Sequence, residues 1–184
     1  MGQFSLQKAL QAAAVLLKTE NERRMNYMRL LKLLYIADRE SVRQTGCPIT
    51  HDRIVAMDHG PVPSRFYALI MGRDPASPKW ARFVVTEHFD VELIKDPGNK
   101  KLSGYEIEVL QTVAKERGSL NQWGVRDETH DFPEWEKNYV KGTSVHIPLR
   151  DTLEAVGRGE DAEAILEEAA KVNRFFALLE KADQ

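Results

Sequence analysis

The sequence has a single cysteine and no long apolar run, and both features narrow what the protein can be. Cys47 is the only cysteine among 184 residues, so an internal disulfide and any zinc site built on two thiolates are excluded. The apolar run from Ala12 to Leu17 is far shorter than the roughly 20 residues that a membrane-spanning helix needs. It also lacks the basic start and cleavage site of a signal peptide. We therefore expect a cytoplasmic protein that makes no use of a membrane.

The chain also lacks an excess of basic residues. It carries 26 Lys and Arg against 28 Asp and Glu, a formal net charge of −2, and its isoelectric point is about 6.2. Proteins dedicated to nucleic acids usually show a concentrated basic stripe, because phosphate neutralisation supplies much of their affinity. No helix-turn-helix extension precedes residue 5. We expect no direct contact with nucleic acid.

What the sequence does contain is enough apolar material for one buried core. Hydrophobic residues make up 42% of the chain, and its length is that of one ordinary domain. No internal repeat or low-complexity linker divides it. The sequence therefore predicts a single domain over residues 1–184.

Hydrophobic periodicity predicts a mainly α fold with a small antiparallel β-sheet (α+β), a compact helical bundle around a buried central helix. The predicted helices cover residues 6–18, 25–44, 104–117, 120–130, about 148–157 and 161–181, with a short one ending at Gly72. The predicted strands cover residues 49–57, 83–86 and 89–94, and residues 58–63 are expected to form a rigid loop.

Three of these helices carry specific local signals. Helix 25–44 is apolar around most of its circumference, which marks it as the centre of the core. Ser103 and Glu106 form a capping box that starts helix 104–117, and Ser119 with Gln122 repeats that pattern for helix 120–130.

The residues that could carry chemistry do not form a recognisable catalytic or metal-binding pattern. Cys47 lies near His51 and His59 in the sequence, but a Cys–His pair requires contact in space and a lowered thiol pKa. The five histidines show no His-x-x-x-His or Glu-x-x-His spacing. We therefore expect no catalytic residue, no metal and no cofactor, and a hydrolase based on Cys47 or the histidines stays the least favoured alternative.

Several short motifs in consecutive order together resemble the Panacea domain, the SocA-like antitoxin family. In the first half these are Lys32-Leu33-Leu34-Tyr35-Ile36-Ala37-Asp38, Gly46-Cys47-Pro48-Ile49-Thr50, Asp52-Arg53 and Gly60-Pro61-Val62-Pro63. In the second half they are Leu102-Ser103, Glu106, Leu110, Thr129-His130, Pro133 and Trp135. The resemblance covers roughly residues 5–140, and residues 148–184 add C-terminal helices. Glu134 is a departure, since it separates Pro133 from Trp135 where a more compact pair is expected.

The resemblance implies a mainly helical protein without enzymatic activity that acts as an antitoxin encoded beside a toxin. Its expected partner is a cognate protein toxin, neutralised by direct binding. A second function attributed to this family is that of a proteolytic adaptor, which delivers a bound toxin to a cytoplasmic protease. The sequence does not decide between these two, and it leaves the oligomeric state open.

A rigid turn next to arginine and tyrosine offers a preorganised contact surface, and both residue types are common at interface hot spots. We therefore expect His59, Arg65 and Tyr67 to contact the toxin. Trp123, His130 and Trp135 are expected either to brace that turn or to extend the surface.

The last helix carries an apolar stripe formed by Ile165, Ala169, Val172, Phe176 and Leu179. A helix that closes the protein's own core is the favoured interpretation of this stripe. A partner-binding face at Phe175 and Phe176 is the second.

Overall fold

The computed structural model of the chain describes residues 3–182, without the side chains of residue 173 and residues 176–182. The fold is mainly helical with small antiparallel sheets, which confirms the predicted fold class. The helices are α1 (Leu6–Leu17), α2 (Tyr27–Thr45), α3 (Ser64–Ile70), α4 (Ser77–Trp80), α5 (Gly104–Glu116), α6 (Gln122–His130), α7 (Pro133–Asn138), α8 (Leu149–Ala155) and α9 (Ala162–Ala182). The strands are β1 (Arg24–Asn26), β2 (Ile54–Met57), β3 (Gly60–Pro63), β4 (Val84–Glu87), β5 (Asp90–Leu93) and β6 (Val145–His146), and a 3-10 turn, Asn21–Arg23, precedes β1.

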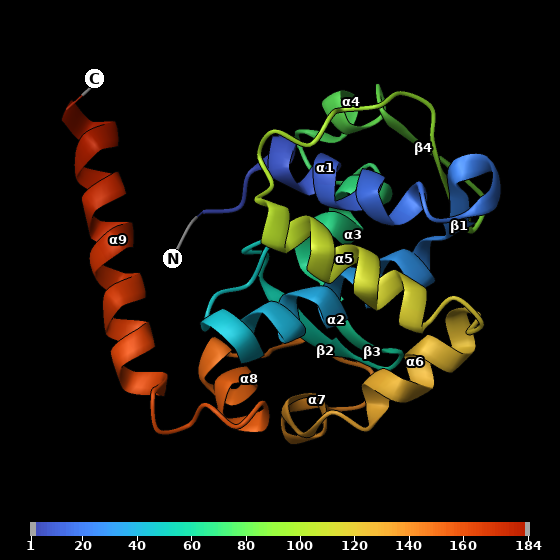
Figure 1. Cartoon of the computed structure of the whole chain (residues 1–184). Helices are drawn as coiled ribbons and strands as arrows, with labels where there is room; N and C mark the ends of the chain where they lie inside the picture. Colours follow the sequence, from blue (N-terminus) through green and yellow to red (C-terminus); the bar gives the residue numbers. More distant parts are fainter. Residues whose placement is uncertain (1–2, 183–184) are drawn as a thin grey trace.

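Helix α2 is the centre of the hydrophobic core, as its apolar circumference predicted. The side chains of Leu30, Leu33 and Leu34 are fully buried. The helix begins at Asn26, whose Oδ1 accepts a hydrogen bond from the Met28 N–H at 3.0 Å, and it ends at Gly46 in the left-handed conformation. Figure 1 shows α1 and α5 above α2, and α6, α7 and α8 below it. Because neighbours cover it on several sides, an all-round apolar surface is stable there.

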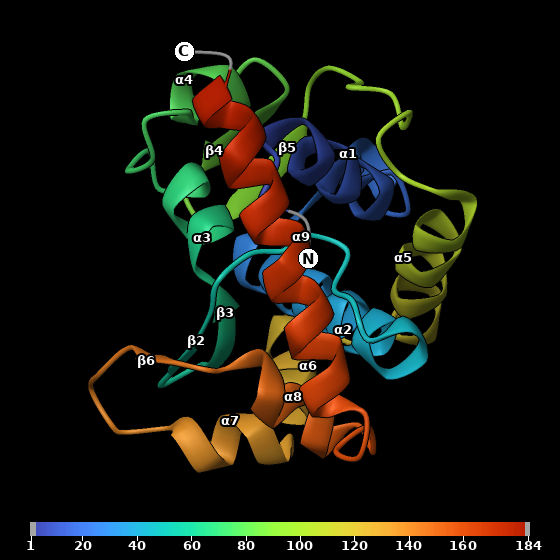
Figure 2. The same ribbon diagram turned by 90° about the vertical axis from the view of Figure 1, so that its left-hand side faces the viewer.

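The strands form two sheets rather than the single small sheet expected. One has the order β1-β5-β4 and the other the order β3-β2-β6, and all pairs are antiparallel. Strands β4 and β5 lie where the sequence predicted them. Strands β1 and β6 were not predicted, because each is short and pairs with a strand distant in the sequence. Figure 2 shows β2, β3 and β6 together at one edge of the body.

The prediction that residues 58–63 form a loop is wrong for most of the segment. Only residues 58 and 59 form the turn, and Gly60–Pro63 is strand β3, paired with β2 from Ile54 opposite Pro63 to Met57 opposite Gly60. Proline is tolerated here because β3 is an edge strand, whose outward N–H groups have no partner within the sheet. Pro61 and Pro63 therefore made the sequence of strand β3 resemble a loop.

The start of α6 also differs from the prediction. Its cap is Asn121, whose Oδ1 accepts hydrogen bonds from the N–H groups of Trp123 and Gly124, both at 3.0 Å. Ser119 therefore does not begin the helix, since an asparagine close to the first turn supplies the acceptor instead. The sequence also did not predict α4 and α7, which are short helices with a proline at their starts.

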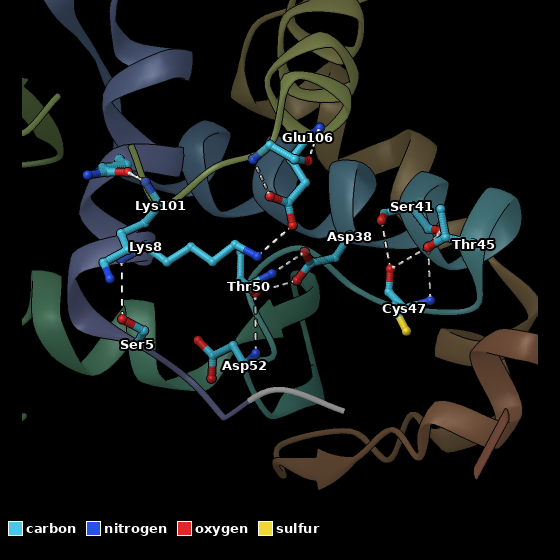
Figure 3. A network of polar contacts seen from close by, with 12 residues as sticks. Ser5, Lys8, Asp38, Ser41, Thr45, Cys47, Thr50, Asp52, Lys101 and Glu106 are labelled. Carbon is cyan, nitrogen blue, oxygen red and sulfur yellow. Dashed lines mark hydrogen bonds and ion pairs between the residues drawn. The ribbon is translucent and has the colours of Figure 1, made fainter. Parts of the chain in front are cut away.

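The predicted capping box of α5 is confirmed, and it also connects two helices. Ser103 Oγ accepts from the Glu106 N–H at 3.2 Å, and the Ser103 N–H donates to Glu106 Oε2 at 2.8 Å. The other oxygen, Glu106 Oε1, accepts from Lys8 Nζ of α1 at 2.5 Å (Figure 3). The residue that closes the cap therefore also fixes α1 against α5.

Helix α9 is attached to the body through its first turns. Ala162 is buried with Leu153 of α8 and Val42 of α2, and Ile165 packs against the same cluster. Further along, Phe175 is 59% exposed. The start of α9 thus closes a small core, as one interpretation of its stripe predicted. The side chains of Phe176 and Leu179 lie outside the described residues.

Candidate functional site

The predicted contact residues His59 and Tyr67 line one surface cavity of about 420 Å³. We call it the aromatic cavity and define it by Tyr27, Lys32, Asp58, His59, Val62 and Tyr67. Helix α2 forms its inner wall, the β2–β3 hairpin and α3 form two further sides, and residues 142–144 close it. A cavity of this size accommodates a large side chain of a bound partner.

Aromatic rings extend along one side of the aromatic cavity. The rings of Tyr27 and Tyr67 are 6.4 Å apart, and Tyr27 stacks on Phe89 at 6.3 Å. Phe89 lies in the turn between β4 and β5 and is 69% exposed. These three rings form a continuous apolar path from the cavity to the surface.

A second aromatic group lies beside His59. The Trp123 ring approaches His59 edge-on at 6.1 Å, and the Arg126 guanidinium lies 4.9 Å from the Trp123 ring centre. Trp123 is 47% exposed although it is the largest type of apolar side chain. We call Tyr27, His59, Tyr67, Phe89 and Trp123 the aromatic rim. The structure thus brings His59, Tyr67 and Trp123, which the sequence singled out, to one surface.

Trp135 braces the hairpin from beneath instead of extending that surface. It is only 7% exposed, and its Nε1–H donates to the Met57 carbonyl at 3.1 Å. Its ring stacks on His130 at 4.2 Å and on Tyr139 at 4.7 Å. Burial lowers the pKa of His130, which favours the neutral form of its imidazole. Of the two roles expected for Trp135, the structure therefore favours bracing.

Arg65 lies apart from the other predicted residues. Its guanidinium donates to Asp74 at 3.0 Å and covers the Phe4 ring at 4.5 Å, away from the aromatic cavity. Its backbone N–H donates to Asp52 Oδ1 at 3.0 Å, and the Phe66 N–H donates to Asp52 Oδ2 at 2.9 Å. A carboxylate from outside the helix thus caps α3. The geometry assigns Arg65 to the start of α3 rather than to the cavity.

Asp58 fixes the wall of the cavity opposite α2. Its Oδ1 accepts from the Gly142 N–H at 2.8 Å and from the Tyr139 hydroxyl at 3.0 Å. The bond from Gly142, followed by that from Tyr139, lowers the pKa of the Asp58 carboxyl. The hairpin turn and residues 139–142 are therefore held together by one ionised carboxylate.

Lys32 is a functional candidate that the sequence reasoning missed. Only 1% of it is exposed, and its Nζ donates to the Pro61 carbonyl at 2.7 Å. Burial, with a smaller contribution from the Arg126 charge, lowers the Lys32 pKa to about 7. The signal was a lysine inside an otherwise apolar stretch of the central helix, where a solvated side chain has no room.

Gly60 allows β3 to approach Lys32 closely. Its φ is +88°, and a Cβ there would lie 2.7 Å from Thr129 Oγ1 and 3.0 Å from Lys32 Nζ. The 2.7 Å distance to Thr129 is shorter than real Cβ contacts, the distance to Lys32 is tighter than most of them, and the backbone conformation itself favours glycine. Close packing of β3 against Thr129 and Lys32 therefore explains the glycine at position 60.

Asp38 and Cys47 belong to a separate polar network, shown in Figure 3, that holds the segment after α2. Asp38 accepts from the Thr50 N–H at 2.9 Å and from the Thr50 hydroxyl, and burial raises its pKa to about 7. Cys47 takes part through its backbone, since its carbonyl accepts from Ser41 Oγ at 2.7 Å. No hydrogen bond joins the Cys47 thiol to a histidine among the residues described, so the arrangement of a cysteine hydrolase is not seen there.

Within the part of the chain that the structure describes, no group of three or more His, Cys, Asp and Glu side chains could hold a metal ion. Within residues 3–182, no helix combines the length and the apolar character that crossing a bilayer requires.

A family model described as "Antitoxin SocA-like, Panacea domain" matches residues 30–136, more than half of the chain. The matched region includes α2 from Leu30 onward, the β2–β3 hairpin, Phe89 and Trp123. Among curated proteins and among solved structures, no match to the chain is found.

Proposed function

Because this chain belongs to the SocA-like Panacea domain family of antitoxins, we propose that it neutralises a cognate protein toxin by binding it directly at the aromatic rim. The family gives an antitoxin-like role and, with it, a toxin as partner. What we propose beyond the family's general role is the place of contact, the aromatic rim, and the means of neutralisation, direct binding.

The exposed rings of Phe89 and Trp123 on two sides of the aromatic cavity are the observation that carries this proposal. Large aromatic side chains are normally buried, and those that remain exposed beside a concave surface are typical of protein interfaces. Tyr27, Tyr67 and His59 connect the two exposed rings across the cavity. A partner that covers the aromatic rim buries all five side chains together.

The proposal is tested with the product of the reading frame adjacent to the gene, co-expressed and co-purified with this chain. Trp123→Ala and Phe89→Ala should each weaken binding by about thirtyfold, since truncating a central hot spot costs at least about 2 kcal/mol. Ile94→Ala is the matched control, because Ile94 is a 53% exposed apolar residue outside the aromatic rim. Growth rescue should fall with both rim variants and persist with the control.

All three variants are first checked for an unchanged melting temperature, so that lost binding is not lost folding. Should Trp123→Ala and Phe89→Ala both bind within about twofold of the parent, a change well under 1 kcal/mol, the aromatic rim is not the interface.

The same co-expression separates direct neutralisation from delivery to a protease. With direct neutralisation, toxin accumulates in a stable stoichiometric complex. With a proteolytic adaptor, toxin disappears when this chain is present and returns in a strain that lacks the cytoplasmic protease. Both mechanisms require a toxin-binding surface, so the rim variants test the contact in either case.

A further inference from the structure

Asp58 gives the aromatic cavity a negative charge that the protein itself does not pair. It is exposed, it is the only acidic residue among those that line the cavity, and within the described residues no basic side chain forms an ion pair with it. Its two hydrogen bonds, from the Gly142 N–H at 2.8 Å and the Tyr139 hydroxyl at 3.0 Å, both go to Oδ1. The other oxygen, Oδ2, accepts no hydrogen bond from the part of the chain described and is available to an external donor.

The basic groups near the cavity do not neutralise this carboxylate. Lys32 also lines the cavity, but it is only 1% exposed and its Nζ donates to the Pro61 carbonyl at 2.7 Å. Its amine is therefore turned into the protein, beneath β3. The charges of His59 and Lys141 act on Asp58 from the hairpin turn and from the segment after α7, and both contribute less than the two hydrogen bonds do.

The rest of the lining near α2 and α3 is apolar or aromatic. It consists of Tyr27, Met28, Leu31, Met57, Val62 and Tyr67. The faces of the tyrosine rings attract cations because of their negative electrostatic potential. Since the two rings lie 6.4 Å apart and contact each other, they form one continuous wall rather than the two sides of a slot. The cavity thus combines an apolar, aromatic wall with one carboxylate.

These features specify the kind of side chain that fits. An acidic side chain of a partner would face the Asp58 carboxylate, and like charges brought together at an interface repel. A purely apolar side chain would contact the wall, but the partner that carries it would remove water from Oδ2 without replacing its hydrogen bonds. A basic side chain has both parts that are needed, a methylene stem for the wall and a charged group that donates to the carboxylate.

We propose that the aromatic cavity receives a basic side chain, Lys or Arg, of the bound toxin, with its charged group paired with Asp58 and its stem against the wall that contains Tyr27, Met28 and Tyr67. This inference rests on the proposed function for the identity of the partner. The preference of the cavity for a cation is a property of this chain alone, and it is measured without a toxin.

The first experiment compares benzylammonium with benzyl alcohol, two ligands of nearly equal shape that differ in charge, by NMR titration of the isolated protein at about 0.15 M salt. Isotope-labelled methionine methyl groups report the place of binding, because Met28 and Met57 line the cavity whereas Met25 lies in the core. Benzylammonium should shift the Met28 and Met57 signals, leave Met25 unchanged and bind at least about threefold more tightly than the alcohol.

Asp58→Asn should abolish that preference, because asparagine keeps an acceptor oxygen for Gly142 and Tyr139 but removes the charge. Glu136→Gln, which removes an exposed carboxylate of α7 outside the cavity, is the matched control and should keep the preference. Equal binding of the two ligands, no binding of either, or signals that shift only outside the cavity overturns the inference. If the melting curve shows that Asp58→Asn is unfolded, the wild-type comparison and the methionine signals still decide the question.

The second experiment is a double-mutant cycle with the toxin. Each toxin Lys is changed to Met and each Arg to Gln, and one such change should cost at least about tenfold in affinity with the wild-type antitoxin and less than about threefold with Asp58→Asn. A looser cavity wall in Asp58→Asn would weaken every toxin variant by the same factor, so only direct pairing produces a coupling confined to one toxin residue.

The two experiments also separate this inference from the proposed function. If the rim variants Trp123→Ala and Phe89→Ala abolish toxin binding but no basic toxin residue couples to Asp58, the inference fails and the proposed function stands. If benzylammonium prefers the cavity but both rim variants still bind the toxin, the proposed function fails and the cation preference of the cavity stands.

Discussion

Replacing Lys32 by Met should make the stability of the protein depend differently on pH. Methionine nearly preserves the length and apolar stem of lysine but removes the titrating amine. The loss of the 2.7 Å hydrogen bond to the Pro61 carbonyl leaves a buried acceptor unpaired, which costs about 1–3 kcal/mol at every pH. The pH-dependent part comes from the amine alone.

The sign and size of that part follow from the Lys32 pKa, which burial lowers from 10.5 to about 7. Between these two values the unfolded chain holds a proton that the folded chain has released, so the stability of the wild type rises with pH. Between a pKa of about 7 in the folded protein and 10.5 in the unfolded chain, the free energy of unfolding rises by roughly 5 kcal/mol, at about 1.36 kcal/mol per pH unit. Between pH 6.5 and pH 9.5 it amounts to about 3 kcal/mol.

Urea unfolding of both proteins at four values between pH 6.5 and pH 9.5 measures this effect. The free energy of unfolding of the wild type, relative to that of Lys32→Met, should rise by about 3 kcal/mol over the range. Titrating groups remote from Lys32 cancel in the difference, and burial lowers the pKa of His130, which lies near Lys32 and Arg126, so its titration shifts toward the acidic side of this range. Leu33→Ala is the control and should differ from the wild type by a constant amount.

A difference between wild type and Lys32→Met that stays constant within about 0.5 kcal/mol would refute the reasoning. Lys32 would then titrate in the folded protein as it does in the unfolded chain, and burial would not have lowered its pKa.

Four further stability predictions follow, each checked by urea unfolding at pH 7. Leu33→Ala, at a fully buried position of α2, should cost about 2–5 kcal/mol, and a loss below about 1 kcal/mol would mean that α2 is not central. Gly60→Ala should cost at least about 1–2 kcal/mol from its φ of +88°, and unchanged stability would contradict the close approach to Thr129. Ser103→Ala should lower the free energy of unfolding by about 1 kcal/mol by removing the cap of α5, and an unchanged value would mean that the capping box does not stabilise the protein. Glu134→Ala should cost roughly 3 kcal/mol, because it removes the buried acceptor of Tyr35 and Arg39, and a neutral effect would exclude that role.

Elements with local signals were predictable from the sequence, and α2 and α5 are the best cases. Their caps at Asn26 and Ser103 and their buried faces depend on neighbours within a few residues. Strand β1 is the opposite case, since the alternation of Arg24–Asn26 is too short to indicate a strand, and the segment becomes one by pairing with β5. Tertiary pairing decides such a segment, and a single sequence does not display it.

The candidate site was predictable in part for the same reason. His59, Tyr67 and Trp123 were chosen as residue types suited to interfaces, and the fold places them on one surface. Arg65 was chosen for the same reason, but its contacts with Asp74 and Phe4 come from outside its own helix. Lys32 was overlooked because it lies among leucines, and that apolar stretch predicted only a core helix.

Glu134 was the residue at which the sequence departed from the expected family pattern, and the structure gives it a place in the core. Its buried carboxylate accepts from the Tyr35 hydroxyl at 2.6 Å and from Arg39 Nε at 2.7 Å, so it fixes α7 against α2. A buried acidic residue is hard to foresee from sequence, since its two partners lie almost a hundred positions away.

The wall of the aromatic cavity at residues 142–144 lies beyond residue 136, where the match to the family ends, whereas Lys32 and the hairpin lie within it. That wall is an exposed segment between α7 and β6, attached to the hairpin through Asp58. Surface connections of this kind change in length and sequence without disturbing a core. A protein built in this way can change one wall of the cavity without altering α2 or the β2–β3 hairpin. For protein engineering, Thr143 and Ser144 are accordingly the lining positions to vary first, because Tyr139 and Gly142 hold the contact with Asp58.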